Sequence, residues 1–265
     1  MKGVDQVKKI WRYPILLLLI LCCLPVTAYA KGGELHWYCV RQKAHRQAIA
    51  APELRFVEEC GGYYIDHVHN EGNEEKVVYL TFDAGYENGN VEKVLNTLSE
   101  TNTPAAFFVL KHFIKANTDL ARRMNEEGHL VCNHTASHPN LANASKEKIR
   151  SELEELERVC TENGIATAPY FRPPEGSFSR EMLEQVRALG YKTVFWSLAY
   201  ADWDNDRQPQ PDTALRLLLD NIHNGAVLLL HPTSATNAEI LPRLIEMLRA
   251  EGYRFGTLHE LCGAS

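Results

Sequence analysis

The chain has 265 residues, a formal net charge of −6, 45% hydrophobic residues and 23% charged residues. This composition is typical of a globular protein that buries one large core or two smaller ones, and it excludes an extensively disordered chain. Because acidic residues outnumber basic ones and no lysine-rich cluster is present, the sequence also argues against nucleic acid as the partner.

Residues 1–30 have the features of a secretory signal peptide. Lys2, Lys8, Lys9 and Arg12 precede the apolar run PILLLLILCCLPV, and AYA then offers the small residues that a signal peptidase reads. The apolar run is shorter than the roughly 20 residues that a membrane-spanning helix needs. We therefore predict an exported protein of the cell envelope or the extracellular space, with an uncleaved membrane anchor as the alternative.

Residues 31–75 are predicted to form an N-terminal extension that precedes a main domain at residues 76–262. The extension is rich in aromatic residues but has no sustained periodicity, and its NEGNEE segment is typical of a solvated loop. His67 and His69 stand two residues apart, and we interpret them as surface histidines in preference to a metal-binding pair.

Five cysteines remain when the signal peptide is set aside. Their number is odd and no two have C-x-x-C spacing, so neither a disulfide framework nor a cysteine-bound zinc is indicated. We expect buried free thiols.

From residue 77 onward, apolar runs alternate with helical patterns. The runs are continuous and not alternating, which is typical of strands buried on both faces of a sheet. Such an alternation predicts a parallel α/β fold, either an open sheet or a barrel, with its site at the carboxyl ends of the strands. The expected strands are 77–82, 105–110, 129–133, 170–172, 192–199, 226–231 and 254–258, and the expected helices are 91–100, 119–128, 146–160, 180–190, 213–223 and 238–252.

Five of these strand ends are followed by side chains that can do chemistry. Since the carboxyl ends of parallel strands meet on one face, we expect these side chains to converge there. They are Asp83, His134 with His138, Arg172, Asp202 with Trp203, and His231.

The segment NHTASHPN is a candidate metal site. His134 and His138 are four residues apart, so on a helical turn their imidazoles would share one ion, and neutral imidazoles suit zinc, cobalt or nickel better than magnesium. Asp83 is either a third ligand or a general base.

The remaining strand-end residues each have a structural and a functional interpretation. Arg172 can hold a carboxylate in a bidentate pair, either for structure or for catalysis. His231 is either a buried histidine bonded to a main-chain carbonyl or a proton donor tuned by Asp202. Trp203 is either a core residue or a flat face for a sugar ring.

The motifs TFD, HTASH, RPP, DW and LLLH occur in this order, and no serine-hydrolase elbow, H-E-x-x-H helix or phosphate-binding loop is present. The ordered set resembles the five motifs of the polysaccharide deacetylases, also called the NodB-homology domain or carbohydrate esterase family 4. The resemblance runs from about residue 76 to 261. It is strongest to the spore-cortex delta-lactam-biosynthetic de-N-acetylases, through TFDAGYENGNVEKVL, EGHLVCNHT, YFRPPEG and NIHNGAVLLLHPTSATNAEIL.

The resemblance implies an α/β fold that is a deformed (β/α) barrel of about seven strands. It also implies a divalent metal, zinc in preference to cobalt or nickel, bound by His134 and His138, that activates the water attacking an N-acetyl carbonyl. It assigns Asp83 as the base and His231 as the acid that protonates the departing amine.

Further residues receive supporting roles from the same resemblance. Arg172 would orient Asp83, and Asp202 would tune His231. The main-chain N–H of Glu175 would help to hold the oxyanion, and Trp203, Pro173 and Pro174 are predicted to contact the substrate.

One position departs from the general family pattern. Most members have a second aspartate directly after the base, where it binds the metal, whereas this chain has Ala84. The delta-lactam branch departs at the same position. The resemblance therefore implies a two-histidine site that is completed by water or by a carboxylate such as Asp83 or Glu87.

These observations together predict a metal-dependent hydrolase that removes the N-acetyl group of N-acetylmuramic acid in peptidoglycan, as in the formation of spore-cortex muramic lactam. Its location would then be the envelope, including the space between the spore membranes, and no protein partner is inferred. The alternatives are a deacetylase of N-acetylglucosamine in peptidoglycan or chitin-like oligomers, a glycan-binding pseudoenzyme, and a structural envelope protein.

Overall fold

The computed structural model describes residues 33–263. The predicted signal peptide lies outside this range, and so does its apolar run. Among the described residues, none of the helices combines the length and the apolar character needed to cross a bilayer.

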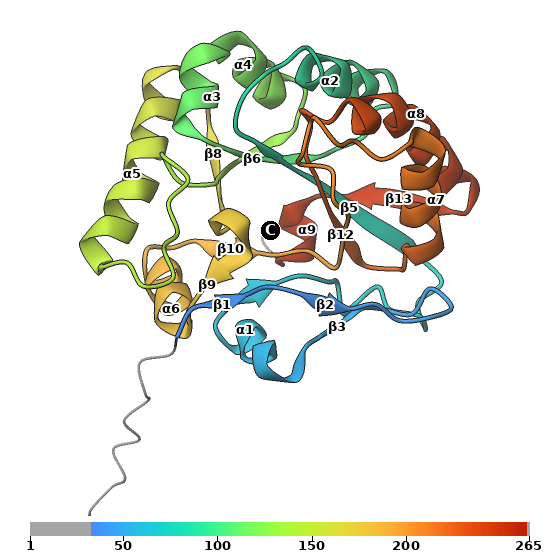
Figure 1. Ribbon diagram of the computed structural model, residues 1–265, viewed down its shortest axis with the longest axis horizontal. Coiled ribbons are helices and arrows are strands. Elements are labelled where there is room, and N and C mark those ends of the chain that lie inside the picture. Colours follow the sequence, from blue (N-terminus) through green and yellow to red (C-terminus); the bar gives the residue numbers. More distant parts are fainter. Residues whose placement is uncertain (1–32, 264–265) are drawn as a thin grey trace, which may run out of the picture. The chain divides into compact units, whose positions relative to one another are not determined.

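A curled parallel sheet forms the centre of the molecule (Figure 1). Its strands follow the order β11-β12-β5-β6-β7-β8-β10-β4, and β13 also pairs with β5, so that the described residues contribute nine strands to it. The α/β prediction is confirmed, with two strands more than the seven expected. The strands are β4 (Gly62–Tyr63), β5 (Lys76–Ala84), β6 (Ala106–Val109), β7 (Leu130–Asn133), β8 (Thr167–Phe171), β10 (Lys192–Val194), β11 (Leu198–Ala199), β12 (Ala226–Leu230) and β13 (Tyr253–Gly256).

The two strands beyond the expected seven have different origins. The segment 192–199 was expected to be one strand, but it divides into β10 and β11 as it crosses between two neighbours. The Phe195 N–H donates to the Tyr63 carbonyl at 2.7 Å, and the Ser197 N–H donates to the Val227 carbonyl at 3.0 Å. The other additional strand, β4, comes from the segment that precedes residue 76.

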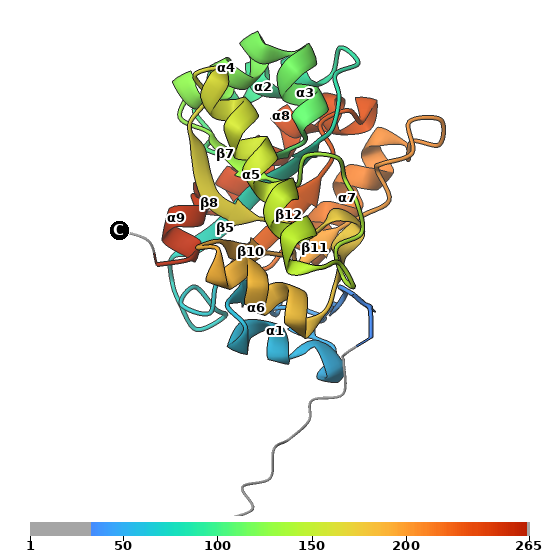
Figure 2. The ribbon, with the colours of Figure 1, turned by 90° about the vertical axis from the view of Figure 1, so that its left-hand side faces the viewer.

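Helices surround the outer side of the sheet (Figures 1 and 2). The six helices expected from periodicity are all present, whereas α1, α3 and α9 are too short to give a periodic signal. The helices are α1 (Phe56–Glu59), α2 (Val91–Glu100), α3 (Lys111–Ala116), α4 (Thr118–Glu126), α5 (Lys146–Glu162), α6 (Arg180–Ala188), α7 (Pro211–Asn221), α8 (Ala235–Ala250) and α9 (Leu258–Leu261), with 3₁₀ turns at Pro52–Leu54 and Pro174–Gly176.

Strand β5 is buried on both of its faces, as its continuous apolar sequence predicts. Val78, Leu80 and Phe82 pack in the cluster formed with the helices. Tyr79 packs with side chains of the neighbouring strands in a separate cluster. Because side chains alternate along a strand, Asp83 shares the face of Tyr79 and emerges at the carboxyl end of the barrel interior.

The cysteines among the described residues are all free. Cys60, Cys132, Cys160 and Cys262 are buried, and Cys39 is half-buried. Burial raises the pKa of the Cys39 and Cys160 thiols to about 12, so they remain protonated at neutral pH. The prediction of free thiols is confirmed for this part of the chain.

Residues 33–75 pack against the barrel and belong to the same compact unit. Strand β1 (Leu35–His36) pairs with β9 (Ser177–Phe178), and β2 (Cys39–Val40) pairs with β3 (Ile49–Ala50). Trp37 is buried and stacks on Phe195 with the ring centroids 4.5 Å apart. In both views the blue segment of the chain runs along the side of the sheet that carries α1 and α6.

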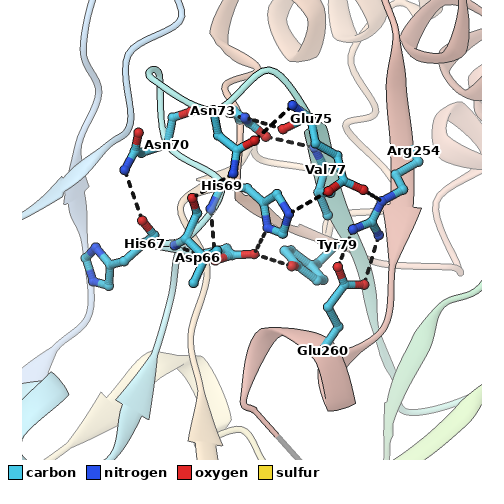
Figure 3. A network of polar contacts seen from close by, with 12 residues as sticks. Asp66, His67, His69, Asn70, Asn73, Glu75, Val77, Tyr79, Arg254 and Glu260 are labelled. Carbon is cyan, nitrogen blue, oxygen red and sulfur yellow. Dashed lines mark hydrogen bonds and ion pairs between the residues drawn. The ribbon is translucent and has the colours of Figure 1, made fainter.

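A buried polar network joins the end of this segment to the barrel (Figure 3). The Asp66 carboxylate accepts a hydrogen bond from the Tyr79 hydroxyl and contacts His69 Nδ1 at 2.6 Å. His69 Nε2 lies 3.2 Å from Glu75, which also pairs with Arg254 on β13.

The interpretation of His67 and His69 as surface histidines is therefore correct only for His67. The His67 side chain is 63% exposed, whereas that of His69 is 10% exposed. The burial of His69 could not be inferred from spacing, because its ring contacts Asp66 and Glu75, and Asp66 is bonded in turn to Tyr79 on β5.

Candidate active site

A cavity of about 740 Å³ opens at the carboxyl ends of the parallel strands. A volume of this size suits a small-molecule or sugar substrate. Five of the residues predicted from strand ends line it together, although they come from distant parts of the sequence. The lining residues are Asp83, His134, His138, Glu175, Gly176, Trp196, Ala199, Tyr200, Ala201, Trp203, Leu229 and His231.

Arg172 and Asp83 form an ion pair beneath the cavity floor. The Arg172 Nη1 atom donates to Asp83 Oδ1 at 2.8 Å, and Nη2 donates to the Thr81 hydroxyl at 2.9 Å. The Nε atom donates to the Val194 carbonyl at 3.0 Å, and the guanidinium lies 4.1 Å from the centroid of the Phe108 ring. The Arg172 side chain is wholly buried, so it fixes Asp83 and does not itself line the cavity.

Asp83 is held in its ionised form. Burial opposes ionisation, but the Arg172 guanidinium outweighs this effect, so the pKa of Asp83 lies below its ordinary value. The Asp83 side chain keeps about 10% of its surface exposed, on the cavity side. It is therefore a carboxylate acceptor at the cavity floor, as a general base requires.

His134 presents an unprotonated nitrogen to the cavity. Its Nδ1 atom lies 2.8 Å from the Arg172 carbonyl, which can only accept, so Nδ1 carries the proton and Nε2 carries a lone pair. Nε2 lies 3.6 Å from Asp83 Oδ2. Burial lowers the pKa of His134 to about 4, so the ring is neutral at physiological pH.

His138 lies beside His134, but not on the helical turn that the spacing predicts. The two ring centroids are 5.0 Å apart, and the segment between them is an irregular loop. Thr135 has φ 75° and His138 has φ 58°, both in the left-handed region. The His138 N–H donates to the Thr135 hydroxyl at 2.9 Å, which stabilises this loop conformation.

Two buried polar residues hold the histidine loop in place. Glu152 on α5 accepts hydrogen bonds from the Ser137 N–H at 2.9 Å and the Ser137 hydroxyl at 2.8 Å. The Asn133 side chain accepts from the Thr135 N–H at 2.8 Å and donates to the Leu153 carbonyl at 3.1 Å. Neither residue was identified from the sequence, because each acts through the loop and not at the cavity.

The two histidines fit a divalent cation by their chemistry. A metal-binding histidine usually donates its second ring N–H to a carbonyl or carboxylate, as His134 does to the Arg172 carbonyl. Residues 33–263 contain no group of three His, Cys, Asp or Glu side chains arranged to hold an ion by themselves. The protein would thus supply two imidazoles, with Asp83 as the adjacent carboxylate.

Asp202 and His231 form a second dyad on the cavity wall. His231 Nδ1 lies 2.8 Å from Asp202 Oδ1, and the His231 N–H donates to Asp202 Oδ2 at 2.8 Å. The Asn237 amide also donates to Oδ2, and it was not identified from the sequence. Burial opposes protonation of the imidazole, but Asp202 outweighs it, so the pKa of His231 is raised. The structure thus favours the interpretation of His231 as a proton donor.

Some of the residues predicted to contact the substrate line the cavity, and others do not. Trp203 lines the cavity and is 61% exposed, so it is not a core residue. Glu175 also lines the cavity, with φ 57° in a tight turn. Pro173 and Pro174 are buried outside the cavity lining, where they precede and begin this turn.

The segment after Asp83 offers no further ligand. Ala84 is fully buried and packs in the cluster formed with the helices. The Glu87 carboxylate accepts the Gly89 N–H at 2.6 Å and the Val91 N–H at 3.0 Å, so it caps the start of α2. Of the two carboxylates suggested for completing a metal site, Asp83 lies next to His134 and Glu87 does not line the cavity.

Trp196, Tyr200 and Leu229 also line the cavity and were not identified from the sequence. Trp196 and Leu229 occur in apolar runs that predict buried strands, and Tyr200 directly follows the first of these runs. The sequence signal that could have identified Trp196 is the pair Phe195–Trp196 within KTVFWSLAY. Strand β10 ends at Val194, so Trp196 lies beyond the strand, where it lines the cavity.

Comparison with known proteins agrees with this geometry. The family model described as polysaccharide deacetylase matches residues 70–194. The peptidoglycan-N-acetylmuramic acid deacetylase PdaA of Bacillus subtilis is 37% identical over 251 residues, which cover 91% of this chain and 94% of PdaA. The chain belongs to the polysaccharide deacetylase family.

Structural comparison gives the same result for this deacetylase. The structure of B. subtilis PdaA, a family 4 carbohydrate esterase, matches with a TM-score of 0.80 and 36% identity, over 86% of this chain and 96% of that one. A family 4 carbohydrate esterase from Bacillus anthracis matches with a TM-score of 0.72 and 37% identity, over 90% of this chain and 100% of that one. These matches confirm the deformed-barrel prediction.

This chain is also similar to a relative whose name gives a different sugar from that of PdaA. A peptidoglycan-N-acetylglucosamine deacetylase of Bacillus cereus is 31% identical over 198 residues, which cover 71% of this chain and 89% of the relative. The family therefore identifies this chain as a hydrolase of N-acetyl groups in polysaccharides, and the names of its relatives give two different sugars as substrates.

Proposed function

We propose that the protein is an exported, metal-dependent de-N-acetylase of N-acetylmuramic acid in peptidoglycan. The proposal depends above all on one observation, the convergence of the Asp83–Arg172 pair and the His231–Asp202 dyad on one cavity. The identity of 37% to PdaA over nearly the whole chain supports the choice of sugar.

The two dyads have complementary roles in amide hydrolysis. Asp83, ionised beside Arg172, accepts the proton of the water that attacks the acetyl carbonyl. His231, protonated through its contact with Asp202, donates a proton to the departing amine. The main-chain N–H of Glu175, in the turn that lines the cavity, is the proposed donor to the developing oxyanion.

His134 and His138 are the proposed ligands of a divalent cation. Zinc suits two neutral imidazoles best, with cobalt and nickel as alternatives. When bound, such an ion polarises the acetyl carbonyl and acidifies water. The chain contributes a neutral His134 ring, whose orientation is fixed by the Arg172 carbonyl, and a loop that brings His138 beside it.

Removal of the acetyl group leaves a free amine next to the lactyl group of muramic acid. An amine in that position is what a muramic delta-lactam requires, and this is the proposed use of the product in the spore cortex. The proposed location is the cell wall outside the membrane, with peptidoglycan strands as the partner.

A second candidate substrate is N-acetylglucosamine, which the similarity to the B. cereus enzyme favours. The test is mass spectrometry of peptidoglycan with and without its peptide stems, and of chitin oligomers, after incubation with the protein and added zinc. We expect loss of acetyl from muramic acid in stripped glycan, and none with the Asp83→Asn variant or a chelator. Faster release of acetate from chitin oligomers would favour the second candidate, and tight glycan binding without any release would indicate a pseudoenzyme.

A further inference from the structure

The described lining of the cavity has no lysine or arginine, and its proposed cation, protonated His231, is already paired with Asp202. Its ionisable lining residues are two carboxylates, three histidines and one tyrosine. Arg172 is the nearest buried arginine, but its guanidinium already donates to Asp83, Thr81 and two main-chain carbonyls. An anionic group on the substrate would therefore find no unpaired positive partner in this lining.

Arg41, from the segment that precedes the barrel, supplies a positive charge at the edge of the cavity. Its Nη2 atom donates to the Ala199 carbonyl at 2.6 Å, and Ala199 lines the same cavity as Trp203 and His231. Arg41 is exposed and has no carboxylate partner within residues 33–263. A guanidinium has five donors in a planar fork, so most of them remain available.

The chain on either side of Arg41 is fixed to the cavity wall. Trp37 donates through its indole Nε1 to the Trp196 carbonyl at 2.8 Å and through its main-chain N–H to the Gly176 carbonyl at 2.9 Å. The Cys39 thiol lies 3.2 Å from the same Trp196 carbonyl. Strand β2, which ends directly before Arg41, is paired with β3. The main chain that carries Arg41 is therefore held in place by these contacts.

We propose that Arg41 binds the carboxylate of the lactyl group on the sugar that is deacetylated, and that it selects glycan without peptide stems. The proposal depends on the proposed function, because N-acetylmuramic acid carries this group and N-acetylglucosamine does not. The lactyl carboxylate is free only when the stem is absent, since the stem occupies it as an amide. Guanidinium and carboxylate form a planar, two-bond pair that no amide can match.

The test compares Arg41→Gln and Arg41→Lys with Arg46→Gln, a matched control on an exposed arginine of the same segment. On stripped peptidoglycan we expect Arg41→Gln to raise KM about tenfold or more with kcat little changed, because the contact is present in both substrate and transition state. Arg41→Lys should recover part of the loss, and Arg46→Gln should match the wild type. With chitin oligomers all four proteins should have the same KM.

A binding measurement separates this proposal from the proposed function. Calorimetric titration with stripped glycan and with chitin oligomers is made in the Asp83→Asn background, with and without Arg41→Gln. Weaker binding of stripped glycan alone supports the lactyl contact, even if the wild type releases no acetate and the proposed function fails. Equal binding of stripped glycan by both proteins, or an equal loss for both ligands, would overturn the role of Arg41.

Discussion

His231 contacts the Asp202 carboxylate through two nitrogens. The imidazole Nδ1 lies 2.8 Å from Oδ1, and the main-chain N–H donates to Oδ2 at 2.8 Å. The side chain and the backbone of His231 are therefore positioned by one buried anion. Because Asp202 is about 1% exposed, water screens its effect on the imidazole only weakly.

The first prediction concerns the pH dependence of catalysis. Asp202 raises the pKa of His231, so the protonated donor persists to higher pH than for an ordinary histidine. Asp202→Asn removes the charge and lowers that pKa. The alkaline limb of kcat/KM should therefore move to lower pH, while the acid limb, set by Asp83 and His134, stays in place. An unchanged alkaline limb would show that another group is the acid.

The second prediction is that Asp83→Asn affects both activity and stability. Loss of the base should lower kcat/KM by about 10²–10⁴-fold. Arg172 is wholly buried, and removing one partner of a buried pair typically costs about 3–5 kcal/mol. The asparagine oxygen still accepts one hydrogen bond, so we expect a loss near the lower end.

Thermal unfolding provides the measurement, and Asp204→Asn provides the control. Asp204 pairs with Arg207, whose side chain is 86% exposed, and such surface pairs contribute little. A melting temperature for Asp83→Asn equal to that of the control would contradict the importance of the buried pair.

The third prediction concerns the exposed tryptophan. Trp203 is 61% exposed and lines the same cavity as His231, so Trp203→Ala should weaken glycan binding without loss of core packing. We expect kcat/KM to fall about tenfold, equivalent to about 1.4 kcal/mol, with zinc affinity and melting temperature unchanged. Met247→Ala, at an exposed apolar residue outside the cavity lining, should change none of these quantities. Full activity of Trp203→Ala would exclude the ring as a sugar platform.

The fourth prediction tests the support of the histidine loop. Glu152→Ala removes the acceptor of both Ser137 hydrogen bonds, so His138 should be held less firmly beside His134. Residues that orient metal ligands typically contribute 10–100-fold in affinity, and a zinc titration should show a loss in that range. Glu154→Ala on the same helix is the control, because its partner Arg150 is exposed. Equal zinc affinities for both variants would mean that the loop needs no such support.

The fifth prediction concerns stability as a function of pH. Burial opposes protonation of His69, but Asp66 and Glu75 outweigh it, so its pKa is raised in the folded protein. A histidine with a raised folded-state pKa contributes stability that is complete below about pH 6.5 and is lost as the pH rises through the folded value. The melting temperature should therefore fall above about pH 6.5 in the wild type.

The variant His69→Gln should lack this part of the pH dependence, whereas His67→Gln should retain it because His67 is an exposed neighbour. Calorimetric melting curves of the three proteins from acid to alkaline pH would measure the difference. Parallel curves for wild type and His69→Gln would mean that the network titrates elsewhere.

Much of the fold and of the site followed from one local rule. Continuous apolar runs between helical patterns indicate parallel strands, and residues that follow such strands meet on one face. The rule places five site residues together from the sequence alone: Asp83, His134, Arg172, Asp202 and His231.

The remaining features depend on partners distant in the sequence. Strand β4 is only two residues long and is defined by its pairing with β10, so it leaves no periodic pattern. The loop around His138 has left-handed φ values at Thr135 and His138. Because neither residue is a glycine, the sequence gives no sign of this conformation. The hydrogen bonds of Asn237 and Glu152 likewise reach across the fold to Asp202 and Ser137.

Strand β5 lies near the beginning of the barrel sequence, yet two of its partners, β12 and β13, come from near the end of the chain. The register pairs Lys76 with Tyr253 and Val78 with Ala226. Folding slows as contacting residues lie farther apart in sequence, because the connecting chain must first be ordered. The centre of the sheet therefore cannot be completed before β13 has been synthesised. A nascent chain that still lacks β12 and β13 cannot complete this sheet, and the proposed export pathway would meet it in that incomplete state.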